Sequence, residues 1–375
     1  MEPCAARNAV VWSGGDARVT FMVSLALRTI EQGLRANGFN VTMGSGARRL
    51  HASSSSGALA TLRDNRDLFV WVGMFDHVRG LSDAKRMRKL GVRTAFYGTE
   101  SHMIWDKKCT IITSLEVDEI WQYTHSNIAR CPESKIGKPA RYVPPGYLPR
   151  EHMAAEARMG GSSKPPPLRA LFLGGFQKFY NQRRFCIGVV QTALVAPALA
   201  ADREAVKSGA ARLPHHRALG ACPGDVARVE YYGHGSICPL QSAYNAYDDS
   251  SWDRYVAMAP YFLNVHKSCN ATARVSEAAC ESFRLSMLLA AGGLVFSEHC
   301  HPLDEMAYAG LVRFGAVDEL GSAMIAEHAV DMAEADYGAA RRRKRLDEFA
   351  LRFSPSAIFE RAGLTISLRR SCTTP

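Results

Sequence analysis

Five polar or charged residues in the second half of the chain either follow a strand-like apolar segment or lie at the start of a predicted helix. They are His266, Lys267, Glu281, Arg284 and Glu298. His266 and Lys267 directly follow the segment 261–265, and Glu298 directly follows the segment 293–297. In an open parallel sheet, ligands bind beyond the carboxyl ends of the strands. We therefore expect these side chains to converge on one crevice.

The residue types in this group suit a ligand with both anionic and hydroxyl groups. A diphosphate needs positive charge and N–H donors, which Lys267, His266, Arg284 and the start of a helix supply. A sugar needs hydrogen-bond acceptors for its hydroxyl groups, which Glu281 and Glu298 supply. The alternative is structural, because Glu281 is favourable in a first helical turn and Arg284 is its salt-bridge partner.

The N-terminal half opens with a strand, a glycine turn and a helix. Residues 9–12 read as a buried strand, Gly14 and Gly15 as the turn, and apolar residues at helical spacing follow. A strand resumes at 39–43, which predicts a β-α-β unit in a parallel sheet. The turn lacks a full GxGxxG pattern and is only a weak nucleotide signal. Further strands are predicted at 68–72, 93–97, 119–121 and 140–143.

The same opening recurs after a segment with the composition of a linker, residues 158–167. A strand at 168–173 is followed by a turn at Gly174 and Gly175 and a helix at 181–195. Later strands are predicted at 229–232, 261–265 and 293–297. Two openings of this kind predict an α/β protein with two doubly wound domains.

The linker sets the predicted domain boundaries. We place the N-terminal domain at 1–155 and the C-terminal domain at 168–350. Ser354 as N-cap and Pro355 at the first helical position predict one more helix. We expect residues 351–375 to return towards the N-terminal domain.

Several segments in order carry a resemblance to a known family. Residues 262–267, 281–293 and 295–298 resemble the C-terminal donor-binding region of group-1 type GT-B glycosyltransferases. In the first half, residues 96–100, 119–128 and 143–147 resemble segments of one bacterial-type branch of that family. The resemblance implies a GT-B fold, with two Rossmann-like domains facing a central cleft.

The resemblance also implies a function. It implies transfer of a sugar from a nucleoside diphosphate sugar, held by the C-terminal domain, to the hydroxyl of a glycan, lipid-linked or small-molecule acceptor. The family's phosphate-binding residues map onto Lys178 with Arg183 or Arg184. No metal or other cofactor is expected, because basic residues and a helix dipole neutralise the leaving diphosphate. A second glutamate common in the family is replaced by Leu289, which leaves the ribose contact and the stereochemical outcome open.

Side chains of the N-terminal half supply candidates for the general base. Glu100 follows the strand at 93–97, and Asp76 and His77 follow the strand at 68–72. Either carboxylate can take a proton from an acceptor hydroxyl, or can simply cap the next helix. Three aromatic residues can stack on sugar rings, with core packing as the default: Trp121, Tyr123 and Tyr147.

The charge pattern and the motifs of the sequence argue against nucleic-acid binding, a metal site and hydrolase activity. The formal charge is +10, but the densest basic run, residues 341–345, lacks interleaved aromatic residues. We interpret it as a solvated helix face and expect no nucleic-acid partner. No DxD pair, HExxH motif or nucleophile elbow marks a metal site or a hydrolase.

Cysteine usage and hydropathy suggest a compartment. The ten cysteines show no CxxC pair, and in a chain of 375 residues they read as reduced, buried residues. No apolar stretch reaches the roughly 18 residues of a membrane span, and no signal peptide is recognised. We expect a cytoplasmic protein without a transmembrane segment.

Two alternative functions stay open beside sugar transfer. One is a GT-B-shaped sugar-nucleotide epimerase or hydrolase, and the other is a noncatalytic nucleotide-sugar binding protein. A dinucleotide oxidoreductase is disfavoured because it needs a complete GxGxxG turn followed by an acidic residue about twenty positions later.

Overall fold

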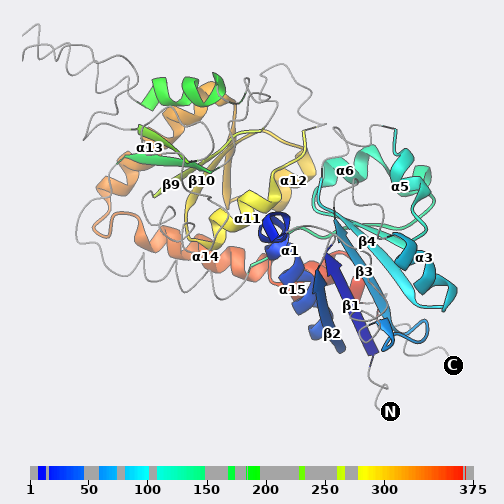
Figure 1. The fold of residues 1–375 in the computed structure, drawn as a ribbon. Helices are drawn as coiled ribbons and strands as arrows, with labels where there is room; N and C mark the ends of the chain where they lie inside the picture. The colour runs from blue at the N-terminus through cyan, green and yellow to red at the C-terminus, as the bar shows by residue number, and fades with distance from the viewer. Residues whose placement is uncertain are drawn as a thin grey trace, which may run out of the picture. The chain divides into compact units, whose positions relative to one another are not determined.

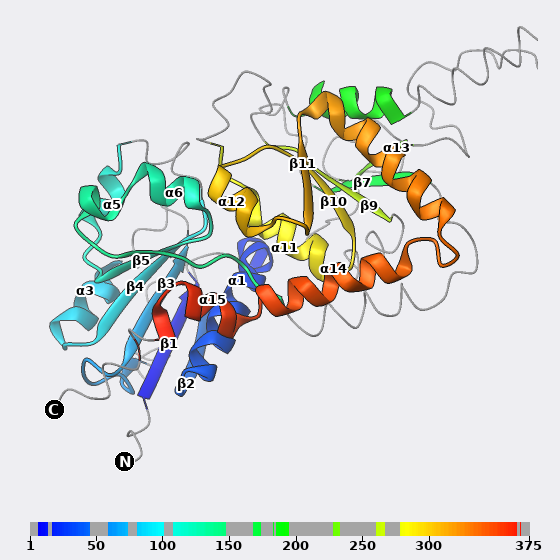
Figure 2. The same ribbon diagram turned by 180° about the vertical axis from the view of Figure 1, so that it is seen from behind.

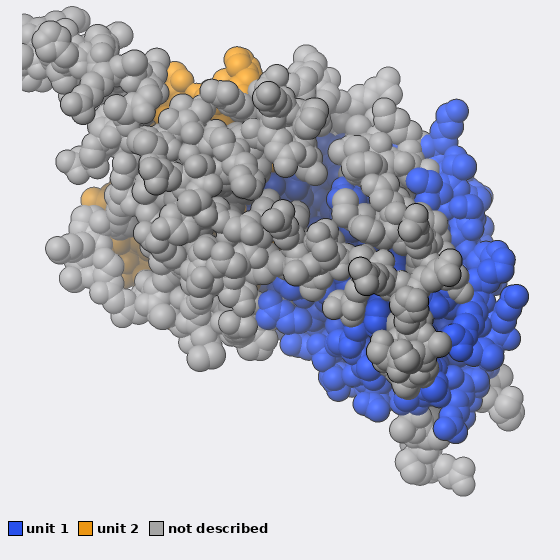
Figure 3. All heavy atoms as spheres, in the orientation of Figure 1, with its two compact units in different colours: residues 1–148, 276–286, 349–375 blue, residues 149–275, 287–348 orange. Residues whose placement is uncertain are grey.

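The chain folds into two compact units (Figure 3). Unit 1 comprises Met1–Leu148, Ser276–Ser286 and Phe349–Pro375, and unit 2 comprises Pro149–Val275 and Met287–Glu348. This computed structural model describes residues 7–13, 17–45, 59–73, 81–100, 108–147, 168–173, 183, 185–194, 228–232, 260–266, 278–365 and 368. The linker predicted at 158–167 lies outside them.

Unit 1 contains, within the described residues, a six-stranded parallel sheet of order β2-β1-β3-β4-β5-β6. Its strands are β1 (Arg7–Ser13), β2 (Phe39–Ser45), β3 (Leu68–Gly73), β4 (Arg93–Gly98), β5 (Glu119–Gln122) and β6 (Ala140–Tyr142). β3 is buried along its whole length. Such burial is typical of parallel sheets, because helices cover both of their faces.

Helices cover the two faces of this sheet (Figures 1 and 2). They are α1 (Ala17–Ala36), α3 (Leu81–Lys89), α5 (Thr110–Ser114), α6 (His125–Arg130), α7 (Glu133–Ile136) and α15 (Pro355–Arg361). α1 packs on β1 and β2, whereas α3 packs on β3 and β4. α15 packs on α1, and a Cβ at Gly33 of α1 would lie only 2.3 Å from the ring of Phe359. The C-terminal helix is thus part of the unit 1 core.

Unit 2 contains a second parallel sheet, described as five strands of order β11-β10-β9-β7-β8. The strands are β7 (Arg169–Leu173), β8 (Arg228–Tyr232), β9 (Tyr261–Asn264), β10 (Leu294–Glu298) and β11 (Val312–Gly315). The labelled helices are α11 (Ser282–Ala290), α12 (Pro302–Ala307), α13 (Val317–Ala333) and α14 (Ala339–Arg352). α11 begins within unit 1, and α14 ends there. Among the helices of the described residues, none is long and apolar enough to cross a membrane.

Both sheets follow the same winding. The first strand of each unit lies between the second and third strands, and later strands extend the sheet on the side of the third. This is the doubly wound order 2-1-3-4-5, whose ligand crevice lies outside the carboxyl ends of its first and third strands. In unit 1 these are β1 and β3, and in unit 2 they are β7 and β9. The prediction of two doubly wound α/β domains is confirmed.

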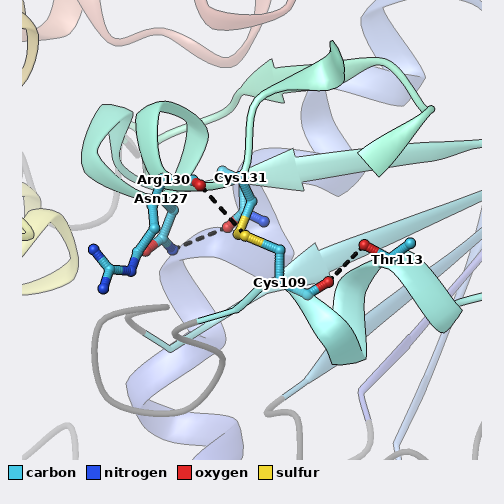
Figure 4. The surroundings of a disulfide bond; sticks show 6 residues. Cys109, Thr113, Asn127, Arg130 and Cys131 are labelled. Carbon is cyan, nitrogen blue, oxygen red and sulfur yellow. Dashed lines mark hydrogen bonds between the residues drawn. A yellow bond between two sulfur atoms is a disulfide. The ribbon is translucent and has the colours of Figure 1, made fainter. Parts of the chain in front are cut away.

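The expectation of reduced cysteines is wrong for the described part of the chain. Cys109 and Cys131 form a disulfide with a Cα–Cα distance of 5.7 Å (Figure 4). Cys109 directly precedes α5, and Cys131 directly follows α6, so the bond joins the ends of two short helices. Three further cysteines are disulfide-bonded: Cys186, Cys280 and Cys300. Spacing gave no signal because residues distant in sequence are paired by the fold.

The basic run at 341–345 is also not simply a solvated face. In unit 2, the carboxylate of Asp331 on α13 is fully buried and forms ion pairs with Arg341 and Arg342 of α14. Asp331 Oδ2 also accepts a hydrogen bond from the Tyr261 hydroxyl at 2.7 Å. Arg341 and Arg345 form ion pairs with Glu327. These arginines tie α14 to α13, and Asp331 in turn links α13 to β9.

Candidate active site

A connected group of predicted site residues lies at the carboxyl end of β9 in unit 2. His266 follows this strand by two residues and is only 6% exposed. Its backbone N–H donates to Oε2 of Glu298, the last residue of β10, at 2.9 Å. Its backbone carbonyl accepts from Nε of Arg183 at 3.3 Å. The structure therefore brings His266, Glu298 and Arg183 together beside the β7–β9 switch point.

The two charged members of this group hold the His266 backbone from opposite ends. Arg183 is 1% exposed, and its guanidinium carbon lies 5.4 Å from the ring centroid of Phe172. Glu298 is 9% exposed. An ionised carboxylate has about four lone-pair sites, so the bond to His266 leaves acceptor capacity. The sugar-hydroxyl role of Glu298 and the phosphate role of Arg183 stay predictions.

Two polar residues without a role in the sequence-based prediction reinforce this end of the sheet. Asn264 Nδ2 donates to the Ser297 hydroxyl at 2.8 Å, and that hydroxyl donates to the Glu298 carbonyl at 2.9 Å. Both side chains are fully buried. Polar residues at the ends of apolar strands were the available signal, but their pairing depends on the β9–β10 register, in which Ser297 faces Asn264.

The start of α11 belongs to unit 1, with the predicted site residue Glu281 directly before the helix and Arg284 in its first turn. Glu281 and Arg284 form an ion pair of 3.5 Å, the contact that the structural alternative expected. The Phe283 ring packs against Tyr123 and Tyr97, with centroids 4.9 and 6.5 Å apart. Because these tyrosines stand at the carboxyl ends of β5 and β4, α11 begins at that edge of the unit 1 sheet. A helix start is electropositive.

Glu100 lies at the same edge of unit 1, two residues after β4. Its side chain is partly buried, and its backbone carbonyl accepts from Nδ2 of the buried Asn127 at 3.0 Å. The same Asn127 amide donates to Oε1 of Gln122 at the end of β5. Sequence reasoning missed Asn127, which fixes the chain at Glu100 from the next strand-helix unit. Glu100 as a base stays a prediction.

The three aromatic candidates pack against other aromatic rings, as the core-packing interpretation expects. Trp121 is 1% exposed and packs edge-on against Phe359, while Tyr123 is 6% exposed. Tyr147 packs edge-on against Phe349. Trp121 and Tyr123 lie in the interior of unit 1, whereas Tyr147 is partly exposed.

Several predicted site residues lie outside the described residues. They are Gly14, Gly15, Asp76, His77, Gly174, Gly175, Lys178, Arg184 and Lys267. Within the described ranges, no group of three or more His, Cys, Asp or Glu side chains is arranged to hold a metal ion.

Comparisons with known proteins identify the fold. No protein-family model matches the chain, and no curated protein matches it in sequence. A sucrose-phosphate synthase from Thermosynechococcus elongatus superposes with a TM-score of 0.52 at 10% identity, over 98% of this chain and 100% of that one. An α,α-trehalose-phosphate synthase (UDP-forming) from Burkholderia vietnamiensis superposes with a TM-score of 0.55 at 11% identity, over 100% of this chain and 99% of that one.

A third similar structure is an α-glucosyltransferase in complex with UDP and a 13-mer DNA containing an HMU base. Its TM-score is 0.55 at 10% identity, over 97% of this chain and all of that one. The similarity therefore extends over almost the whole length of this chain. The chain has the GT-B fold of these glycosyltransferases.

Proposed function

We propose that the protein is a glycosyltransferase that moves a sugar from a nucleoside diphosphate sugar to an acceptor hydroxyl. The observation that carries this proposal is the group of His266, Glu298 and Arg183 at the β7–β9 switch point, the position where doubly wound sheets bind nucleotides. Two solved structures of the same fold are described as UDP-forming or as a complex with UDP. UDP-linked sugars are therefore the first donors to test.

The proposed division of labour follows the two units. In unit 2, Arg183 is proposed to contribute positive charge for the diphosphate, together with Lys267 and the N–H donors of the turn predicted from the sequence at Gly174. In unit 1, Glu100 is proposed to serve the acceptor and Glu281 the hydroxyl groups of the transferred sugar. Arg284 and the start of α11 keep their predicted role of adding positive charge for the diphosphate. No resident cofactor enters this proposal.

The proposed reaction is a substitution at the anomeric carbon of the donor sugar. A bond forms between the acceptor oxygen and the anomeric carbon, and the bond from that carbon to the diphosphate oxygen breaks. The nucleoside diphosphate leaves, and Glu100 takes the proton of the acceptor hydroxyl as general base. Positive charge near the diphosphate stabilises the leaving group.

The partners follow from this chemistry. The donor is a sugar nucleotide, and the acceptor is a glycan, a lipid-linked sugar or a small molecule, without nucleic acid. A cytoplasmic location stays a prediction, and the disulfide between Cys109 and Cys131 argues against it because such bonds persist in oxidising compartments.

Binding and turnover with a donor panel test the proposal. Purified protein is melted with UDP-, GDP-, ADP- and dTDP-linked sugars, with free glucose and inorganic phosphate as controls. A ligand at a hundred times its Kd adds about 2.7 kcal/mol of stability, which is a readily measured shift in Tm. Release of nucleoside diphosphate is then followed with and without acceptor mixtures.

Each outcome of that experiment has a distinct meaning. Stabilisation by one donor and acceptor-dependent release support transfer. Release without acceptor identifies a hydrolase, and stabilisation without release identifies a binding protein. No stabilisation and no release with any donor refute the proposed function.

A further inference from the structure

The protonation of the His266 ring follows from its contacts. Its Nε2 lies 3.1 Å from the backbone carbonyl oxygen of His299. A carbonyl oxygen can only accept a hydrogen bond, so Nε2 carries the proton. In the neutral ring, Nδ1 is then an acceptor with a free lone pair.

That acceptor is buried and, among the residues that the structure describes, Nδ1 has no hydrogen-bond partner. The residue as a whole is 6% exposed. A buried polar atom without a partner is costly, and in native structures such atoms mark catalytic or binding roles or an unseen partner. The contact of Nε2 with the His299 carbonyl holds the ring, while Glu298 and Arg183 fix the backbone of His266 on both sides.

We propose that Nδ1 of His266 accepts a hydrogen bond from a hydroxyl group of the sugar-nucleotide donor, an inference that rests on the proposed function. The position at the end of β9, beside the switch point of unit 2, is where a nucleotide is expected. A neutral acceptor nitrogen does not suit an anionic phosphate oxygen, so this proposal gives His266 a hydroxyl partner in place of the phosphate predicted from the sequence. His266 thus selects for a hydroxyl group, either of the ribose or of the transferred sugar.

Two amide replacements separate the two ring nitrogens. His266→Gln places an amide near the Nε2 position, where it can still donate to the His299 carbonyl, but offers nothing at Nδ1. His266→Asn places an amide oxygen near the Nδ1 position, where it can still accept. His299→Gln is the matched control, because its imidazole is 43% exposed.

The binding of UDP-glucose, UDP and 2′-deoxy-UDP is measured by calorimetry for the wild-type protein and these variants. We expect His266→Gln to weaken UDP-glucose binding by about tenfold, the scale of one buried hydrogen bond, and His266→Asn and His299→Gln to stay within about threefold of wild type. If the hydroxyl is the ribose 2′-hydroxyl, the binding of UDP weakens equally in His266→Gln and that of 2′-deoxy-UDP does not. If it is the ribose 3′-hydroxyl, the binding of all three ligands weakens in His266→Gln but not in His266→Asn. If it belongs to the transferred sugar, only UDP-glucose weakens.

The opposing results are equally specific. Wild-type affinity in a folded His266→Gln variant overturns the assignment while leaving the donor site intact. Equal losses in both His266 variants for every ligand, including 2′-deoxy-UDP, also overturn it, because they indicate ring packing. If wild-type protein binds neither UDP nor UDP-glucose, a UDP-linked donor is refuted, and the role of His266 falls with it.

Discussion

Removal of the Cys109–Cys131 disulfide is the sharpest test of the fold of unit 1. Both cysteines are buried in the core beside α5 and α6, at 0% and 2% exposure. The bond closes a loop with a sequence separation of 22, which contains β5. Chain-entropy reasoning assigns about 3 kcal/mol to a loop of this length, through the lost freedom of the unfolded chain.

The double variant Cys109→Ala/Cys131→Ala removes this bond and leaves the other disulfide-bonded cysteines in place. We expect the free energy of unfolding to fall by about 3 kcal/mol. For a unit of this size, that corresponds to a Tm lower by roughly 6–12 °C. Urea unfolding followed by near-UV circular dichroism, without reductant, measures the difference.

Complete reduction of both proteins provides the control. Reduced wild-type protein lacks the same crosslink, so the difference between wild type and variant should shrink to the small packing cost of two alanines. A variant as stable as wild type without reductant would show that these cysteines are not joined. A deficit unchanged by reduction would show that side-chain packing, not the crosslink, is responsible.

Three further predictions follow from buried or charged groups. Asp331→Ala should lower the unfolding free energy by about 3–5 kcal/mol in urea melts, because it leaves Arg342, whose side chain is 13% exposed, without its carboxylate partner. A loss below about 1 kcal/mol contradicts this. Burial lowers the pKa of His328 below its ordinary 6.5 despite the nearby Asp331 carboxylate, so the unfolded state binds more protons below that pH. Stability should therefore fall as pH decreases from 6.5 through the folded pKa, and His328→Phe should flatten this dependence in melts between pH 5 and 7.5; an unchanged slope argues against it. Glu281→Ala should reduce turnover by at least roughly tenfold with little change in Tm, because its partly exposed 3.5 Å pair with Arg284 is worth under about 1 kcal/mol; unchanged activity with a lower Tm supports the helix-capping role.

The sequence by itself determined the secondary structure and the winding of the fold. Buried parallel strands are continuous apolar runs, such as residues 68–72, and are visible without knowledge of their neighbours. β11 was not predicted, because an exposed arginine at position 313 interrupts its apolar pattern. A strand at the edge of a sheet shows a weaker apolar pattern than one in the middle.

The sequence also placed polar residues at the correct ends of the strands. Parallel strands that alternate with helices have all their carboxyl ends at one edge, so position in the chain was enough to bring His266 and Glu298 together. It could not assign their chemistry. The proton on Nε2 of His266 depends on the carbonyl of residue 299, thirty-three positions away in the chain.

Only the tertiary structure decided which charged and sulfur-containing groups are partners. The arginines at 341 and 342 read as solvated, but α14 follows α13 after a short turn, and its first residues reach the buried Asp331 near the end of α13. Cys109 and Cys131 carry no spacing signal, and they meet because α5 and α6 flank the same strand. The physical reason is common to both cases: apolar periodicity is a local property of the chain, whereas ion pairs and disulfides depend on contacts that exist only once the elements have packed.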